Sequence, residues 1–256
     1  SRIKYPKLIL GTGLSISYKL PGMKELATRL DEDFSKRPDD KIKEVWECKK
    51  DVIFKNGLEE GLKGINMAAI HERECVELIK KYTARFVLEE EIDKFDEIMN
   101  NNTGFKKMLT HLSLSVSTNN PILDVMTPNY DRIVELVCDS LKINVVNGFL
   151  GHNIRHFNYD VLGEPKRFYN SRKFCVRLFK PHGSLDWIRL SDEIACTSDN
   201  NRLLKNSEFI EIITPGTSKY EMGLLNDTFR YVREKFNEIL SISTNYSIVI
   251  FGLDKT

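Results

Sequence analysis

Two side chains suited to acid–base and hydrogen-bond chemistry follow apolar runs of this chain. His182 comes shortly after the run that ends near Lys180, and Gly183 follows it. Histidine titrates near neutral pH, so its ring can take a proton from a hydroxyl group. Asn129 follows another apolar run, and its amide both donates and accepts hydrogen bonds, so it can hold a water molecule or a ribose hydroxyl. Taken alone, a histidine such as His182 is more often a buried residue bonded to the backbone, and the structural role of Asn129 is that of a helix cap.

A glycine-containing turn follows the first apolar run, and its sequence is Gly11-Thr12-Gly13-Leu14-Ser15. Two glycines let a backbone approach a ligand closely, and the helix expected after them offers unpaired N–H groups to a phosphate. The third glycine of the dinucleotide-binding fingerprint is missing, so a plain tight turn explains the pattern equally well. The chain has no GxxxxGK[ST] motif, which leaves a kinase or ATPase without support.

The remaining polar candidates are weaker. Asp131 lies at an expected helix start, where capping of the free N–H groups is a sufficient reason for a carboxylate. His152 and His156 have a metal-ligand spacing, but no third ligand is evident and a loop is expected there, so no metal site is predicted. Ser184 lies near the histidine at 182, yet the chain has no G-x-S-x-G elbow, and a hydrolase triad is not expected.

A parallel sheet is needed to bring these residues together. The apolar runs predict strands at 7–10, 122–126, 143–146, 174–180, 209–214 and 247–251, with an irregular stretch at 148–172. Helical spacing of apolar residues predicts helices at 23–30, 68–88, 104–119, 133–141 and 225–240. This alternation predicts an α/β fold, a Rossmann-like parallel sheet with helices on both faces. The turns after its strands would then converge at one edge, where such sheets bind ligands.

The segment from about 31 to 120 differs from the rest because it is charged, rich in helix formers and poor in proline. It predicts a helical insertion within a single domain that spans residues 1–256. The chain stops shortly after the last expected strand, without a closing helix. We therefore expect it to be the N-terminal part of a longer protein.

The composition is that of an ordinary globular protein. Of the 256 residues, 41% are hydrophobic and 29% are charged, and the formal net charge of +1 gives no case for direct binding to nucleic acid or to a membrane. No apolar run reaches the roughly 18–20 residues of a transmembrane helix. The five cysteines are scattered and form no CxxC pair, so neither a disulfide framework nor a structural zinc site is expected. These features predict a reduced, cytoplasmic protein.

Taken in order, the turns resemble one family. GTGLS, TPNYD, KPHGSLDW, IITPGTSK and a last strand that ends in Gly252 resemble a sirtuin-like domain, most closely the bacterial sirtuin-like domains of antiviral defence proteins. The resemblance runs from Leu8 to Gly252, with the helical insertion unaligned. It implies an NAD-binding site with Asn129 at the nicotinamide ribose or the attacking water and His182 as base or polariser. The other positions that it assigns to NAD binding are Gly11, Thr12, Gly13, Ser15, Thr127, Asp131 and Gly252, with Asp131 supporting the Asn129 turn and Gly252 facing the adenosine ribose.

Two departures from the family narrow the expected activity. Thr12 stands where the family usually has alanine, which adds a hydroxyl near the phosphates. The four-cysteine zinc module of protein-deacylating sirtuins is missing, so deacylation is not expected. The resemblance then implies an NAD glycohydrolase, with NAD as substrate and no metal, that acts in bacterial antiviral defence by depleting NAD.

The resemblance also suggests how such an enzyme is controlled. Because uncontrolled NAD loss is toxic, we expect a homo-oligomer, or a partner protein or fused C-terminal domain that triggers activity. A module that senses NAD or ADP-ribose without hydrolysing it is the alternative, and a scaffold that assembles through residues 31–120 is compatible with the enzyme.

Overall fold

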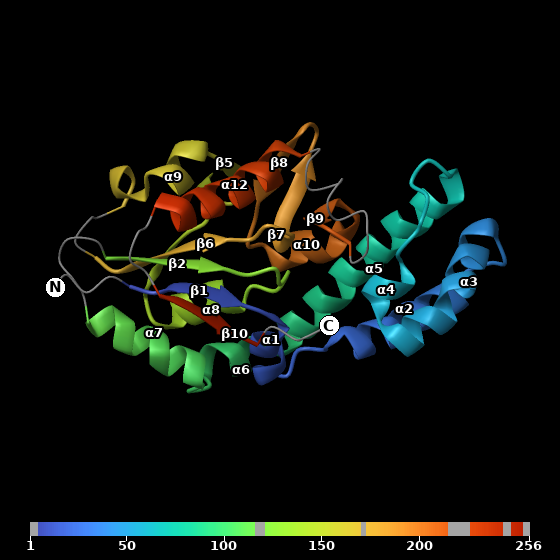
Figure 1. The fold of residues 1–256 in the computed structure, drawn as a ribbon, viewed down its shortest axis with the longest axis horizontal. Helices are drawn as coiled ribbons and strands as arrows, with labels where there is room; N and C mark the ends of the chain where they lie inside the picture. The colour runs from blue at the N-terminus through green and yellow to red at the C-terminus, as the bar shows by residue number, and fades with distance from the viewer. Residues whose placement is uncertain (1–4, 116–120, 170–172, 215–225, 243–246, 253–256) are drawn as a thin grey trace.

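The computed structural model describes residues 5–115, 121–169, 173–214, 226–242 and 247–252. Its centre is an all-parallel five-stranded sheet, sheet A (Figure 1). From one edge to the other, sheet A contains β10 (Ile248–Phe251), β1 (Lys7–Leu10), β2 (Ile122–Met126), β6 (Cys175–Phe179) and β3 (Asn144–Val146). The register aligns Leu8 with Val125 on one side and with Val249 on the other. The expected Rossmann-like α/β fold is confirmed.

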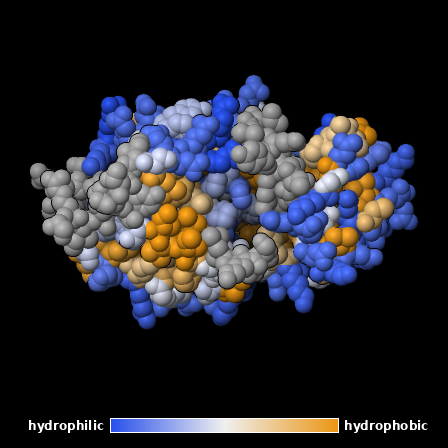
Figure 2. Space-filling view, viewed as in Figure 1, coloured by the Kyte–Doolittle hydropathy of each residue, from blue (hydrophilic) through white to orange (hydrophobic). Residues whose placement is uncertain are grey.

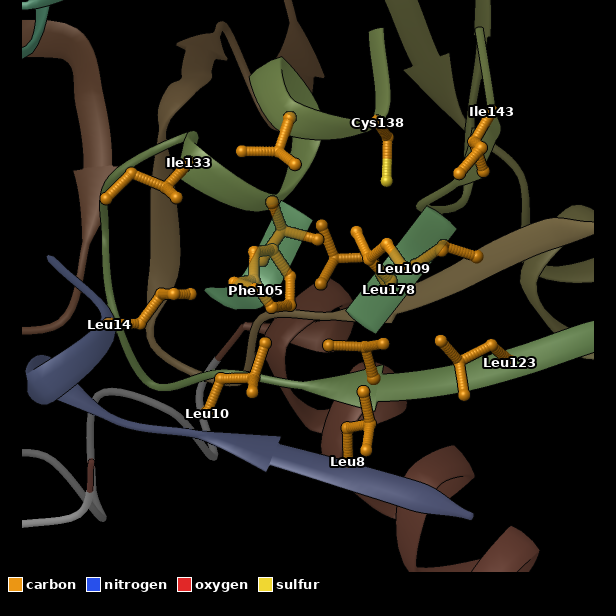
Figure 3. Close-up of a cluster of buried hydrophobic side chains, with 14 of the residues drawn as sticks. Leu8, Leu10, Leu14, Phe105, Leu109, Leu123, Ile133, Cys138, Ile143 and Leu178 are labelled. Atoms are coloured by element: carbon orange, nitrogen blue, oxygen red, sulfur yellow. The ribbon is translucent and has the colours of Figure 1, made fainter. Parts of the chain in front are cut away.

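Helices cover both faces of sheet A. Successive side chains of a strand point to opposite faces, so Leu8 and Leu10 lie on one face and Ile9 on the other. The first face packs against α7 (Gly104–Leu114) and α8 (Ile133–Ser140), whose apolar residues recur at helical spacing (Figure 3). This core includes Leu8, Leu10, Leu14, Phe105, Leu109, Leu123, Val125, Ile133, Val137, Cys138 and Leu178. The second face packs against α12 (Asp227–Ile242).

A second sheet, sheet B, is antiparallel and was not expected from the sequence. Its order is β4 (Phe149–Gly151), β5 (Arg155–Phe157), β8 (Glu193–Cys196), β7 (Gly183–Leu190) and β9 (Ile210–Ile212). The strand predicted at 209–214 therefore belongs to sheet B, and its assignment to the parallel sheet was wrong. The stretch predicted to be irregular, 148–172, contains β4, β5 and α9 (Tyr159–Gly163). Strands of three residues are too short to show a clear alternation of side chains.

The helix-rich segment forms an arm and two further helices that join the main body. The arm consists of α2 (Met23–Ser35), α3 (Lys41–Asn56), α4 (Leu58–Gly61) and most of α5 (Ile70–Asp93), around the stacked rings of Phe34 and Trp46 (Figure 1). The end of α5 packs against sheet B through Ala84 and Leu88. In contrast, α6 (Phe95–Asn100) and α7 belong to the core of sheet A, so the predicted insertion of 31–120 is helical but not one separate unit. The last four residues of the helix predicted at 104–119 lie outside the described residues.

One edge of sheet A carries an apolar surface. All four residues of β10 are exposed, and Figure 2 shows hydrophobic surface over this region.

None of the helices in the described ranges combines the length and the apolar character that crossing a bilayer requires.

Candidate active site at the carboxyl edge of sheet A

The turns that follow four parallel strands meet at one edge of sheet A, as predicted. The N–H of Gly11, after β1, donates to the carbonyl of Phe251 at the end of β10 over 2.8 Å. The N–H of Thr127, after β2, donates to the carbonyl of Phe179 at the end of β6 over 3.0 Å. The side chain of Asn129 then joins these two pairs of turns, because its Nδ2 lies 2.9 Å from the Gly11 carbonyl oxygen.

Asn129 is held by a chain of side-chain hydrogen bonds. Besides Gly11, its Nδ2 donates to the hydroxyl of Ser15 over 2.9 Å. That hydroxyl donates in turn to Oδ2 of the buried Asp131 over 2.6 Å. Thr127 Oγ1 accepts the Asn129 backbone N–H over 3.1 Å. Both amide protons of Asn129 are therefore used within the protein, and the atom it can offer to a ligand is Oδ1.

Asp131 has the structural role that its position suggested, together with a second contact. Its Oδ1 accepts the N–H of Ile133 in the first turn of α8 over 3.2 Å, which satisfies one free donor of that helix. Its Oδ2 holds Ser15, which lies in the short helix α1 (Thr12–Ser17). Asp131 therefore links the start of α8 to the glycine turn and supports Asn129 through Ser15.

Gly13 and Gly252 pack directly against each other. The N–H of Gly13 donates to the Gly252 carbonyl over 2.8 Å, and a Cβ added at Gly13 would lie 2.6 Å from the Gly252 Cα. This contact explains why both positions lack a side chain, and it uses the N–H that a phosphate would need at Gly13. The roles predicted for Gly13 and Gly252 at NAD stay predictions. Thr12, half-buried, is the first residue of α1.

His182 lies in the turn between β6 and β7. Gly183 adopts a φ of +82°, a conformation that glycine takes without strain. The half-buried His182 accepts the Ile213 N–H at its backbone carbonyl over 2.9 Å. The Tyr130 hydroxyl donates to the Ile213 carbonyl over 2.5 Å. The beginning of the IITPGTSK motif is therefore hydrogen-bonded to the turn of His182 and to the turn of Asn129. Residues 215–219 of that motif lie outside the described residues.

A cluster of buried charges lies beneath these turns, and the sequence analysis did not identify it. Its members are Glu91, Arg132, Glu135, Lys180 and Asp186. Lys180 pairs with Glu135 over 3.0 Å, and Arg132 pairs with Glu91 over 2.6 Å. Lys180 directly follows β6 and Asp186 lies in β7, and because charged residues are normally exposed, the sequence did not indicate that either is buried.

Burial and neighbouring charges shift the pKa values of this cluster in different directions. Burial raises the pKa of Glu135 to about 7, and Lys180 opposes the rise only in part. Burial alone would lower the pKa of Lys180, but Glu135 and Asp186 outweigh it and the net pKa is raised. Asp186 is also desolvated, yet Lys180 and Arg132 hold its pKa below the ordinary value. Of Glu135 and Asp186, Glu135 is thus the carboxyl group that binds a proton near neutral pH.

Replacing Glu135 by glutamine is expected to flatten the dependence of stability on pH. Between its ordinary pKa of 4.5 and about 7, Glu135 keeps a proton in the folded chain and loses it in the unfolded chain. The free energy of unfolding therefore falls as pH rises through this window, by roughly 1.4 kcal/mol per unit of pKa difference. Urea unfolding at several pH values between 4.5 and 8 measures this slope. Glu60→Gln, at an exposed position, should keep the wild-type slope, and equal slopes for wild type and Glu135→Gln would contradict the expectation.

Two cavities lie elsewhere in the described structure. One, of about 190 Å³, lies between α5, β9 and the start of α12, next to Lys80 and Glu211. The other, of about 640 Å³, lies beside α10 (Asn200–Lys205) and the 3₁₀ turn η2 (Ser207–Phe209). Neither is lined by Asn129, His182 or the glycine turn, so the candidate site is defined by its converging turns.

The other histidines considered from the sequence lie on sheet B, away from these turns. His152 lies in the turn between β4 and β5, and the exposed His156 pairs with Glu193 over 2.9 Å. Among the residues that the structure describes, no group of three or more His, Cys, Asp or Glu side chains is arranged to hold a metal ion.

No protein-family model matches this chain, and no match was found among the curated proteins with which it was compared.

Proposed function

We propose that this chain is an NAD glycohydrolase, which cleaves NAD to nicotinamide and ADP-ribose. The observation that carries the proposal is that Asn129 and His182 follow neighbouring parallel strands and lie on adjoining turns at the carboxyl edge of sheet A. In doubly wound α/β sheets this edge is where ligands bind. The order of the motifs, which resembles that of sirtuin-like domains, supports NAD as the ligand.

The proposed reaction breaks the bond between C1′ of the ribose and the nicotinamide nitrogen. The bonding electron pair leaves with the cationic ring as neutral nicotinamide, and positive charge develops on the ribose. Water adds to C1′ and releases one proton, which His182 takes up and passes to solvent. Asn129 Oδ1 orients the water or a ribose hydroxyl. Such a transition state depends on positioning and electrostatics more than on a strong acid, so the proposal includes no metal.

The glycine turn takes the phosphate and ribose end of NAD in this proposal. Gly11, Thr12 and Ser15 lie on the same edge as Asn129, and the hydroxyl of Ser15 is bonded to Asn129 and to Asp131. Thr127 and Asp131 shape the turn that carries Asn129. Gly252 borders the adenosine side, next to Gly13.

The resemblance also suggests the biological setting. An enzyme of this kind would act in bacterial antiviral defence, because NAD depletion stops the metabolism of an infected cell. We further propose control by self-association or by a partner protein or domain, since unregulated hydrolysis of NAD is toxic.

The test is NAD turnover by the purified chain, followed as release of nicotinamide and ADP-ribose. Asn129→Ala and His182→Ala should each lower turnover by at least ~100-fold, the usual contribution of a positioned acid–base group. Asn101→Ala and His156→Ala are matched controls at exposed positions outside these turns and should retain wild-type turnover. Circular dichroism and the melting temperature establish that each variant is folded.

Different outcomes separate the alternatives. Turnover that both site variants lose supports hydrolysis at this site. Binding of NAD or ADP-ribose by calorimetry without turnover would instead support the sensing module. Neither turnover nor binding, in a folded protein with its assembly size measured, would contradict the proposal.

A further inference from the structure

Lys180 is a fully buried lysine at the junction of the two turns that carry Asn129 and His182. It follows β6 directly, and its side chain is 2% exposed. A buried ammonium ion requires partners for its three N–H groups and compensation for its charge. Because Lys180 lies two residues before His182, its partners show which segments hold the His182 turn in place.

The partners of Lys180 come from both turns. Its Nζ donates to the carbonyl oxygen of Asp131 over 2.5 Å and lies 3.4 Å from that of Tyr130, in the turn after β2. It also lies 2.8 Å from the hydroxyl of Ser184, in the segment after β6. One backbone hydrogen bond runs parallel to this connection, from the N–H of Leu185 to the Tyr130 carbonyl over 3.0 Å. The ammonium group is therefore a cross-link between the two turns.

The groups around the Lys180 ammonium ion compensate for its charge. Two backbone carbonyls point their negative ends at the ammonium group, and the Glu135 carboxyl lies 3.0 Å away. Hydrogen bonds from an ionised donor are roughly twice as strong as neutral ones. An uncharged side chain of the same length would fill the space but would leave the carbonyls and Ser184 without this donor.

We propose that Lys180 is a positioning residue of the candidate active site and that its buried ammonium group sets the spacing between Asn129 and His182. This inference rests on the proposed function and deepens it. Lys180 does not touch the substrate in this proposal; it fixes the backbone from which the two reacting side chains extend. A displacement of about 1 Å between catalytic groups can lower a rate on the order of 100-fold.

The experiment uses a variant that removes the cation together with the carboxyl group that pairs with it. Lys180→Met combined with Glu135→Gln replaces both members of the pair by side chains of similar size that cannot ionise, and Glu135→Gln alone is its reference. Lys80→Met is the matched control, because Lys80 is also buried and pairs with a buried carboxylate, Glu211, over 3.1 Å. Circular dichroism and thermal unfolding establish that all variants are folded at the assay temperature.

We expect the double variant to lower kcat for NAD hydrolysis about 10- to 100-fold relative to Glu135→Gln, with KM nearly unchanged, since the loss concerns the reacting geometry. Lys80→Met should retain kcat. A double variant with the kcat of its reference, or an equal loss in Lys80→Met, overturns the role of Lys180 while leaving NAD hydrolysis intact. A wild-type chain that does not hydrolyse NAD in the same assay overturns the proposed function, and the inference with it.

Discussion

Replacing Asp124 by alanine is expected to lower the free energy of unfolding by about 3–5 kcal/mol, the usual effect of removing one partner from a buried ion pair. Asp124 lies in β2, and its side chain is 2% exposed. It pairs with Lys7 of β1 through Oδ2 and with Arg177 of β6 through Oδ1, the latter over 2.6 Å. Without the carboxylate, two cations would remain on one face of sheet A without their shared counter-charge.

The size of this effect follows from how deeply the three charges lie. The side chains of Lys7 and Arg177 are 14% and 11% exposed, so water compensates little for a lost partner. Arg177 is fixed further, since its guanidinium group lies over the Phe179 ring and donates to the Leu162 carbonyl over 3.3 Å. The cluster joins three adjacent strands, β1, β2 and β6, and the turns of the candidate site follow these strands.

Urea-induced unfolding measures the loss, and an exposed pair supplies the control. Asp39 pairs with Lys43 over 2.8 Å in the helical arm, but its side chain is 97% exposed. Asp39→Ala should change the free energy of unfolding by no more than about 1 kcal/mol, as is usual for surface pairs. Similar losses for Asp124→Ala and Asp39→Ala would contradict the prediction, because the buried cluster would then stabilise the fold no more than an exposed pair does.

The parallel sheet and the arrangement of its turns were predictable because the relevant signals are local. Strands buried on both faces are mostly apolar runs, and Lys7–Leu10 and Ile122–Met126, each with one charged residue, are recognisable without any partner. Parallel strands end at a common edge, so the residues after them had to approach one another. The contact of Asn129 with Gly11 confirms that reasoning at the level of atoms.

Sheet B and the buried charges were not predictable by the same reasoning. The eight-residue strand β7 contains Gly183, Ser184, Asp186 and Arg189, which obscure the pattern of a buried strand. Charged residues are normally exposed, so a sequence alone favours solvent for Lys180. Glu135, which compensates for the burial of the Lys180 charge, is brought next to Lys180 only by the fold. Gly13 and Gly252 are far apart in the sequence, so local sequence patterns do not indicate that they pack against each other.

Both the packing of sheet B and the position of the adjacent His182 require that residue 183 has no Cβ. A Cβ at this position would lie 2.2 Å from the Glu211 carbonyl oxygen in β9 and 2.9 Å from the ring of Phe229 in α12. The φ of +82° adds strain for any other residue. Gly183→Ala therefore combines an unfavourable backbone conformation, about 1–2 kcal/mol, with steric overlap of about 1–3 kcal/mol.

We expect Gly183→Ala to lower the free energy of unfolding by about 3 kcal/mol or more and to displace the adjacent His182. Two glycines separate the causes. Gly64 also has a positive φ, +74°, but an added Cβ there would meet nothing within 4 Å, so Gly64→Ala should show the backbone cost alone. Gly104, in open space at the start of α7, should tolerate alanine without loss. Urea unfolding of the three variants measures the difference, and equal losses for Gly183→Ala and Gly64→Ala would mean that β9 does not close on the His182 turn.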